Sequence, residues 1–145
     1  SRLQRAGASA GFDVYAVFDV PAGYRLRSIL VRSHGAGKLA QSAFTDPDRG
    51  AFINLVQATQ GSSPFFTPRN EHTTTPVMVR GGDGMWVEGV ILIRRAVWTA
   101  VAEEVKTRWL VWQEDGFDFS LYGNGLALDD ALRLAESLSP VQLME

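Results

Sequence analysis

Histidine and serine are the residues of this sequence that could do acid–base or nucleophilic chemistry. The two histidines are His34, which follows Ser33 in a glycine-rich segment, and His72. A Ser–His–Asp mechanism needs its three groups within mutual reach, and the sequence has no Gly-x-Ser-x-Gly motif to expose a nucleophile. The histidines also lack the i, i+4 spacing that places two zinc ligands on one face of a helix. We therefore predict that the chain is not an enzyme and has no catalytic, metal or cofactor site; an enzyme that uses His34 or His72 is the third hypothesis.

Aromatic residues point to binding rather than catalysis. Phe65 and Phe66 lie within residues 59–76, a long Pro- and Thr-rich stretch without periodicity. Connections of this length are often functional. The pair either packs back onto the core or forms an exposed contact point, so Phe65 and Phe66 are our candidate interaction surface.

The sequence contains four tryptophans, which is a large number for a domain of this size. We expect Trp86 and Trp109 to fill a core between a sheet and a helix. Trp112 and Tyr122 flank a predicted hairpin turn and could pair across it. Packing is the interpretation we adopt for these rings, and a ligand cradle is the alternative.

The overall composition narrows the classes of partner. The chain has 145 residues, a formal net charge of −2 and no cysteine, which excludes disulfides and thiolate metal sites. No long block of like charges is present, so we predict no nucleic-acid partner. No apolar stretch approaches the roughly 20 residues of a transmembrane helix, so we predict no membrane insertion by this segment. The sequence opens on Ser1 without an initiator Met, which is typical of a processed or excised piece.

The hydrophobic pattern predicts a lead-in followed by one domain. Residues 1–11 are small and polar without periodicity, so we expect a flexible lead-in there and a single α+β domain over residues 12–145. Alternating apolar residues bounded by Gly, Pro and Asp predict a series of strands, the first four in an antiparallel meander. These strands are predicted at residues 12–20, 24–31, 38–45, 51–58, 77–79, 85–93, 108–113 and 117–122.

The C-terminal part carries the clearest local signals. Asp115-Gly116 between two alternating runs predicts a type I′ hairpin, because both central residues of that turn need positive φ. Apolar residues at helical spacing predict a helix over residues 128–138 that Pro140 ends. Residues 94–106 are Val-rich, and we expect a short helix or an irregular segment there. The predicted fold class is α+β: mainly an antiparallel sheet of about six to eight strands packed by the C-terminal helix, with room for one further short helix.

The segment WQEDGFDFSLYGNGLALDDALRLAESL, residues 112–138, resembles the C-terminal signature of a bacterial family of domains of unknown function. That signature is a W-x-E-x-G hairpin followed by a helix of the type Leu-acidic-acidic-x-Leu-x-x-Ala-Glu-Ser-Leu. Residues 21–24 resemble the family's P-x-G-Y motif, and residues 77–86 resemble its V-x-V-x-G-x-x-G-x-W stretch.

The resemblance implies an antiparallel sheet with the C-terminal helix packed on it and no catalytic residues. Members of the family form the extracytoplasmic part of anti-sigma-factor-like membrane proteins and of some lipoproteins. We therefore expect a non-catalytic, extracytoplasmic sensory or interaction domain of a membrane-anchored regulator or lipoprotein in the cell envelope, with an unknown protein or small ligand as its partner. The alternative is a carrier of a small apolar ligand or lipid, with a pocket between sheet and helix beneath Trp86 and Trp109.

Overall fold

Two helices and nine strands make up the part of the chain that the computed structural model describes, which comprises residues 2–17, 20–34, 37–60, 73–93, 103–124 and 126–141. The elements are α1 (Arg2–Ala10), β1 (Val14–Val17), β2 (Arg25–His34), β3 (Gly37–Asp46), β4 (Ala51–Thr59), β5 (Thr73–Val79), β6 (Gly82–Ile93), β7 (Glu103–Glu114), β8 (Phe117–Gly123), α2 (Leu128–Glu136) and β9 (Leu138–Val141). The predicted α+β class is confirmed, with one strand more than the expected upper number.

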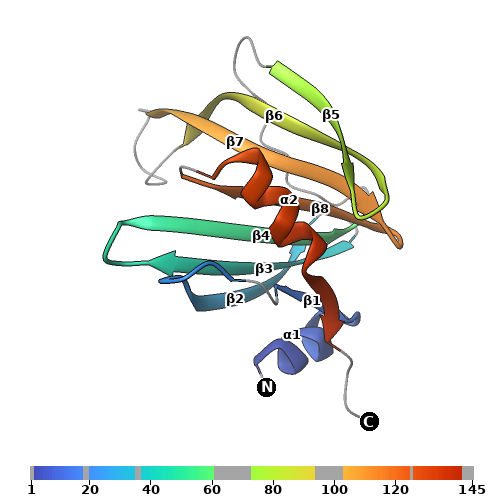
Figure 1. Cartoon of the computed structure of the whole chain (residues 1–145). Helices are drawn as coiled ribbons and strands as arrows, with labels where there is room; N and C mark the ends of the chain where they lie inside the picture. The colour runs from blue at the N-terminus through green and yellow to red at the C-terminus, as the bar shows by residue number, and fades with distance from the viewer. Residues whose placement is uncertain are drawn as a thin grey trace.

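The strands form two antiparallel sheets (Figure 1). The larger sheet has seven strands in the order β2-β3-β4-β8-β7-β6-β5, and the smaller one pairs β1 with β9. β2, β3 and β4 form the predicted meander, but β1 is not part of it because its partner is β9. α2 lies across one side of the larger sheet, which we call the inner face, and contacts β5, β7 and β8 (Figure 1). The opposite side is the outer face.

Two-residue turns set the register of two hairpins in the larger sheet. Arg80 and Gly81 connect β5 to β6, and Asp115 and Gly116 connect β7 to β8. The φ values are 52° and 78° in the first turn and 52° and 81° in the second, as in type I′ turns, whose twist matches that of the paired strands. The Asp-Gly prediction is confirmed. The first turn is shorter than the gap between the predicted strands 77–79 and 85–93, since residues 82–84 belong to β6.

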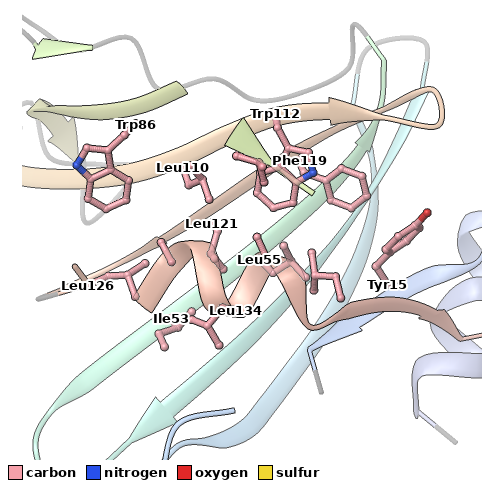
Figure 2. Close-up of a cluster of buried hydrophobic side chains, with 14 of the residues drawn as sticks. Tyr15, Ile53, Leu55, Trp86, Leu110, Trp112, Phe119, Leu121, Leu126 and Leu134 are labelled. Carbon is pink, nitrogen blue, oxygen red and sulfur yellow. The ribbon is translucent and has the colours of Figure 1, made fainter. Parts of the chain in front are cut away.

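Alternation along the strands places one set of apolar side chains on the inner face, where they pack against α2 (Figure 2). Phe119 and Leu121 of β8 are 1% and 0% exposed there. The Trp112 indole stacks on the Phe119 ring with the two centroids 5.1 Å apart. The buried residues of this core are Tyr15, Phe44, Ile53, Leu55, Val79, Trp86, Leu110, Trp112, Phe119, Leu121, Leu126, Ala131, Leu134, Ala135 and Leu138. Removal of this apolar surface from water is the main term that holds α2 on the sheet.

The predicted positions of two tryptophans are wrong. Trp86 is in the inner core, but Trp109 lies on the outer face, because successive residues of β7 alternate between faces and Trp112, three residues on, points inward. Trp112 is paired with Phe119 across the hairpin, and it is Trp109 that lies opposite Tyr122. One pocket therefore cannot lie beneath both Trp86 and Trp109.

The N-terminal segment also differs from the prediction. Residues 2–10 form α1 in place of a flexible lead-in, and Ala6 and Ala10 are buried. α1 contacts β1, β2, β3 and β9, and Ala6 packs in a cluster with Val14 and Ala40. Because its buried residues are small, α1 carries only a weak hydrophobic signal, and contact with the sheets stabilises the helix.

In three further segments the secondary structure differs from the sequence-based prediction. Residues 103–106 belong to β7 and not to a short helix or irregular segment, whereas residues 94–102 lie outside the described part of the chain. Residues 73–76, expected within a long connection, are the first part of β5. α2 ends at Glu136, before Pro140, which lies within β9.

Candidate functional site

Most residues that the sequence singled out as candidate sites fall outside the described part of the chain. Phe65, Phe66 and His72 lie there, and so does the side chain of His34, whose backbone ends β2. Within the described ranges there is no group of three or more His, Cys, Asp or Glu side chains that could hold a metal ion. Neither helix of those ranges has the length and hydropathy needed to cross a bilayer.

A cluster of polar side chains joins the two hairpin turns to the C-terminal end of α2. We call it the Arg80 latch, and it consists of Arg80, Glu114, Glu136, Tyr15 and Asp115. Arg80 Nε donates to Glu114 Oε1 at 2.7 Å, and the Arg80 backbone N–H donates to Glu136 Oε1 at 2.7 Å. Tyr15 Oη donates to Asp115 Oδ2 at 3.0 Å. The latch thus binds together β1, both hairpins and α2.

Arg80 also caps the end of α2. Its Nη1 donates to the carbonyl oxygens of Ala135 at 3.0 Å and of Leu138 at 2.7 Å. Carbonyls in the last turn of a helix have no partner within the helix, so such donors stabilise its end. The guanidinium carbon lies 5.8 Å from the Tyr15 ring centroid, within cation–π range.

The protonation states of the latch suit a structural role. Burial raises the pKa of Tyr15 to about 12, and the hydrogen bond to Asp115 adds to the shift. The hydrogen bond to Glu114 raises the pKa of Arg80. At neutral pH the phenol keeps its proton and the guanidinium keeps its charge, so neither group can act as a general base. The latch therefore stabilises the fold.

A hollow of about 390 Å³ lies between α2, the loop that precedes β2 and the turn at residues 46–50. We call it the Arg49–Arg133 hollow. Its lining residues are Pro21, Ala22, Tyr24, Arg49, Ile53, Leu126, Asp130, Arg133 and Leu134. Its volume falls within the roughly 300–1,000 Å³ of small-molecule sites.

The floor of the hollow is apolar. Ile53, Leu126 and Leu134 are 3%, 6% and 2% exposed, and all three belong to the inner core. Figure 2 shows Ile53 of β4 close to Leu134 of α2. The floor is therefore rigid, because its side chains are also part of the packing that holds α2 on the sheet.

Arg49 stands at the rim and is held by three contacts. Its Nε donates to Asp46 Oδ2 at 2.5 Å, its Nη2 donates to the Ala22 carbonyl at 3.0 Å, and its guanidinium carbon lies 5.5 Å from the Tyr24 ring centroid. Asp46 is buried, and the Arg49 guanidinium holds the pKa of that carboxyl below its usual range. A Cβ at Gly23, where φ is 92°, would come within 2.5 Å of Asp46 Oδ2, so only glycine lets the loop pack this closely.

Arg133 and Asp130 form the helical side of the rim. Arg133 Nη2 donates to Asp130 Oδ1 at 2.5 Å across one turn of α2, and the two side chains are 65% and 48% exposed. Exposed i, i+3 pairs of this kind contribute only a few tenths of a kcal/mol, roughly 0.2–0.5. The pair can therefore exchange its mutual bond for a bond to a ligand at small cost.

The described lining of the hollow includes no Ser, Thr, Cys, His or Lys, and its ionisable residues are Tyr24, Arg49, Asp130 and Arg133. In the sequence, residues 46–50 only separate two predicted strands, and Asp130 only lies within the predicted helix over residues 128–138. No local signal shows that Arg49 and Arg133 meet in one hollow, since the fold alone brings the turn and α2 together.

Comparisons of this chain with protein-family models, with curated proteins and with solved structures found no match.

Proposed function

We propose that this chain is a non-catalytic binding domain that serves as the extracytoplasmic sensory or interaction part of a membrane-anchored bacterial regulator or lipoprotein. The observation that supports the binding role is the Arg49–Arg133 hollow, in which two guanidinium groups stand above an apolar floor. The extracytoplasmic location rests on the resemblance of residues 112–138 to the envelope family.

A ligand in the hollow would touch both layers of the domain. Asp130 and Arg133 belong to α2, whereas Arg49 precedes β4 and Ile53 lies within it. α2 runs into β9 with one residue between them, and β9 pairs with β1, which follows α1. A ligand that bridges the layers would strengthen the attachment of α2 to the sheet, because it binds only the packed arrangement. Through β9 and β1 this stabilisation would reach α1 on the N-terminal side of the domain.

The alternative, a carrier of a small apolar ligand or lipid, has less support. The hollow does lie between the sheet and a helix, as that hypothesis expected, but its rim is built from Arg49, Asp130 and Arg133. The region beneath α2 near Trp86 is packed with core side chains. A charged rim favours a ligand that carries a charge of its own, because an apolar ligand would desolvate the rim without replacing its hydrogen bonds.

Reporter fusions to the full-length gene product test the location. Alkaline phosphatase fused after the last residue of this chain is active only outside the cytoplasm, and β-galactosidase fused there is active only inside it. We expect phosphatase activity and no β-galactosidase activity. The reverse pattern would contradict an extracytoplasmic domain.

The sensory role is tested by variants of the hollow in the same full-length protein. Arg49→Gln combined with Arg133→Gln should change the set of transcripts that the regulator controls, while the phosphatase fusion stays equally active. Arg5→Gln, an exposed arginine of α1 away from the hollow, is the matched control and should leave the transcripts unchanged. Transcript levels that are the same in the double variant and the wild type would contradict a sensory role for the hollow.

A further inference from the structure

We propose that the Arg49–Arg133 hollow recognises a small monocarboxylate with an apolar group, its carboxylate at the arginine rim and its apolar group on the floor. This inference rests on the proposed binding function and names the ligand class of that site. The identification comes from four properties of the hollow: the unused donors of its rim, the fixed position of one arginine, the balance of its charges and the shape of its floor.

The rim has hydrogen-bond donors that the described structure does not use. A guanidinium group carries five N–H donors. Within the described residues, the bonds of Arg49 use one donor to Asp46 and one to Ala22, and the bond of Arg133 uses one donor to Asp130. The remaining N–H groups can therefore bind an oxyanion in the planar, paired geometry that suits a carboxylate.

Arg49 is positioned before a ligand arrives. An arginine on a surface turn normally samples many rotamers, and fixing one costs free energy on binding. Here the bond to Asp46, the bond to the Ala22 carbonyl and the Tyr24 ring hold the guanidinium in place although the side chain is 62% exposed. A ligand that binds Arg49 therefore does not have to order it.

The charge balance of the rim favours one negative charge on the ligand. Arg49 is paired with Asp46 and Arg133 with Asp130, so the formal charges of these four side chains cancel. A dianion such as phosphate would be repelled by both carboxylates and would face no net positive charge. A monocarboxylate can bind the unused N–H groups with half of that repulsion.

The floor of the hollow favours an apolar group at the end of the ligand opposite the carboxylate. Ile53, Leu126 and Leu134 are nearly buried and present a small apolar surface at the bottom of a space of about 390 Å³, to which Pro21 and Ala22 in the wall add. A ring or a short branched chain on this surface gains hydrophobic stabilisation, whereas a second charged group there would be desolvated without a partner. The hollow therefore suits a compact amphipathic acid.

The test uses phenylacetate as the probe and the whole ¹⁵N-labelled chain in NMR titrations. We expect saturable shifts of the amides of Arg49, Leu126 and Arg133 with a Kd on the order of 1 mM, as fits a ligand of this size. Phenylacetamide keeps the shape and removes the charge, and it should bind about tenfold more weakly. Inorganic phosphate and phenethylamine should also bind more weakly than phenylacetate.

Variants assign the effect to the rim. Arg49→Gln and Arg133→Gln should each weaken phenylacetate binding about tenfold, whereas Arg5→Gln on α1 should leave the Kd unchanged. Asp130→Asn should tighten binding several-fold, because it releases Arg133 from its ion pair and removes one repelling charge. A gain in affinity cannot come from a misfolded protein, so this variant separates recognition from stability.

The opposite results overturn the ligand class. Equal binding of phenylacetamide or phenethylamine at the hollow, tighter binding of phosphate, or shifts that avoid the hollow would each exclude a monocarboxylate site. The first two of these would leave the hollow as a binding site for another kind of ligand. The proposed extracytoplasmic location is tested separately, by the activity of the phosphatase fusion.

Discussion

At the scale of single residues, Arg80 combines a strained backbone with an unusually complete set of side-chain partners. Its φ of 52° is unfavourable for a residue that carries a Cβ. The same conformation aims its side chain at Glu114 and at the carbonyl groups that end α2. The hydrogen bonds of the latch therefore offset the strain, and the residue acts as a clamp between the β5–β6 hairpin and the helix.

Arg80→Ala should lower the free energy of unfolding by about 2–4 kcal/mol, because it leaves the half-buried Glu114 without its partner. Arg80→Gly should cost about 1 kcal/mol less than the alanine variant, since glycine relieves the positive φ. Urea unfolding measures both values, and Arg25→Ala on the exposed edge of β2 is the control, with an expected change within about 0.5 kcal/mol. If Arg80→Ala lowers the free energy of unfolding no more than Arg25→Ala does, Arg80 does not act as a clamp.

Tyr15 should make the protein sensitive to alkaline pH. Its pKa of about 12 in the folded state lies above the ordinary value of about 10. Between these values the folded state binds more protons than the unfolded state, so stability falls as the pH rises through that window. Tyr15→Phe removes this part of the loss, although it also removes the bond to Asp115. Burial also raises the pKa of Tyr122, which contributes the same loss to both proteins.

The measurement for Tyr15 is the urea midpoint at pH 9, 10 and 11. The stability of the wild type should fall more steeply over this range than that of Tyr15→Phe. Parallel curves for the two proteins would show that the hydroxyl keeps no raised pKa in the folded state.

At the scale of elements, the two type I′ turns fix the register of the half of the sheet that holds the latch. Gly116 has a φ of 81° and no atom within 4 Å of a Cβ built on it. Gly116→Ala should therefore cost about 1–2 kcal/mol from backbone strain alone. Gly82→Ala is the matched control, because Gly82 has no positive φ and its Cβ would meet only the Val79 carbonyl at 3.7 Å.

Thermal unfolding compares the two glycine variants. We expect a clear loss of stability for Gly116→Ala and a change within about 0.5 kcal/mol for Gly82→Ala. Similar effects of the two substitutions would mean that the turn conformation does not set the stability of the hairpin.

The elements that sequence reasoning predicted are those whose signals are local. Asp115-Gly116 is a turn by its own chemistry, and residues 128–138 carry a helical stripe that needs no knowledge of the rest of the chain. α1 was missed because its buried residues are Ala and Gly. β9 was missed because its four residues do not alternate: the two in the middle, Ser139 and Pro140, are both exposed. Both elements depend on partners distant in sequence.

The sites were harder to predict than the elements. The phase of β7 relative to β6 decides that Trp109 faces outward, and no residue in either strand specifies that phase alone. The sequence pattern places three arginines, Arg80, Arg49 and Arg133, in turns or on the solvent side of a helix. Their roles depend on which turns lie beside α2 in the folded chain. The order of the strands in the sheet decides this, and the sequence pattern does not show it.

At the scale of the whole molecule, the sheet order predicts a gradient of local stability. β4, β8 and β7 have a neighbour on each side, and Leu55, Leu110 and Leu121 pair across them beneath α2. Among the described strands, β6 is the only neighbour of β5 in the sheet, and most residues of β5 are exposed. Strands at the centre should open only with the whole domain, whereas β5 can separate on its own.

Native-state hydrogen exchange followed by NMR tests this gradient. The opening free energy at the amide of Leu121 should equal the free energy of unfolding from urea titration. The value at Val77 in β5 should be lower. Equal values at the two amides would show that β5 opens only with the centre of the sheet.

β5 has one further property that follows from its register. Because Val79 and Gly82 flank a two-residue type I′ turn, they form a hydrogen-bonded pair, and Pro76 then falls at a position whose nitrogen points away from β6. A row of strand amides left open in this way can recruit strands from other molecules, and here the exposed Met78 would add an apolar contact. Proline has no N–H to offer at the middle of that row. Pro76 therefore removes one N–H donor from the row through which β5 could pair with a strand of another molecule.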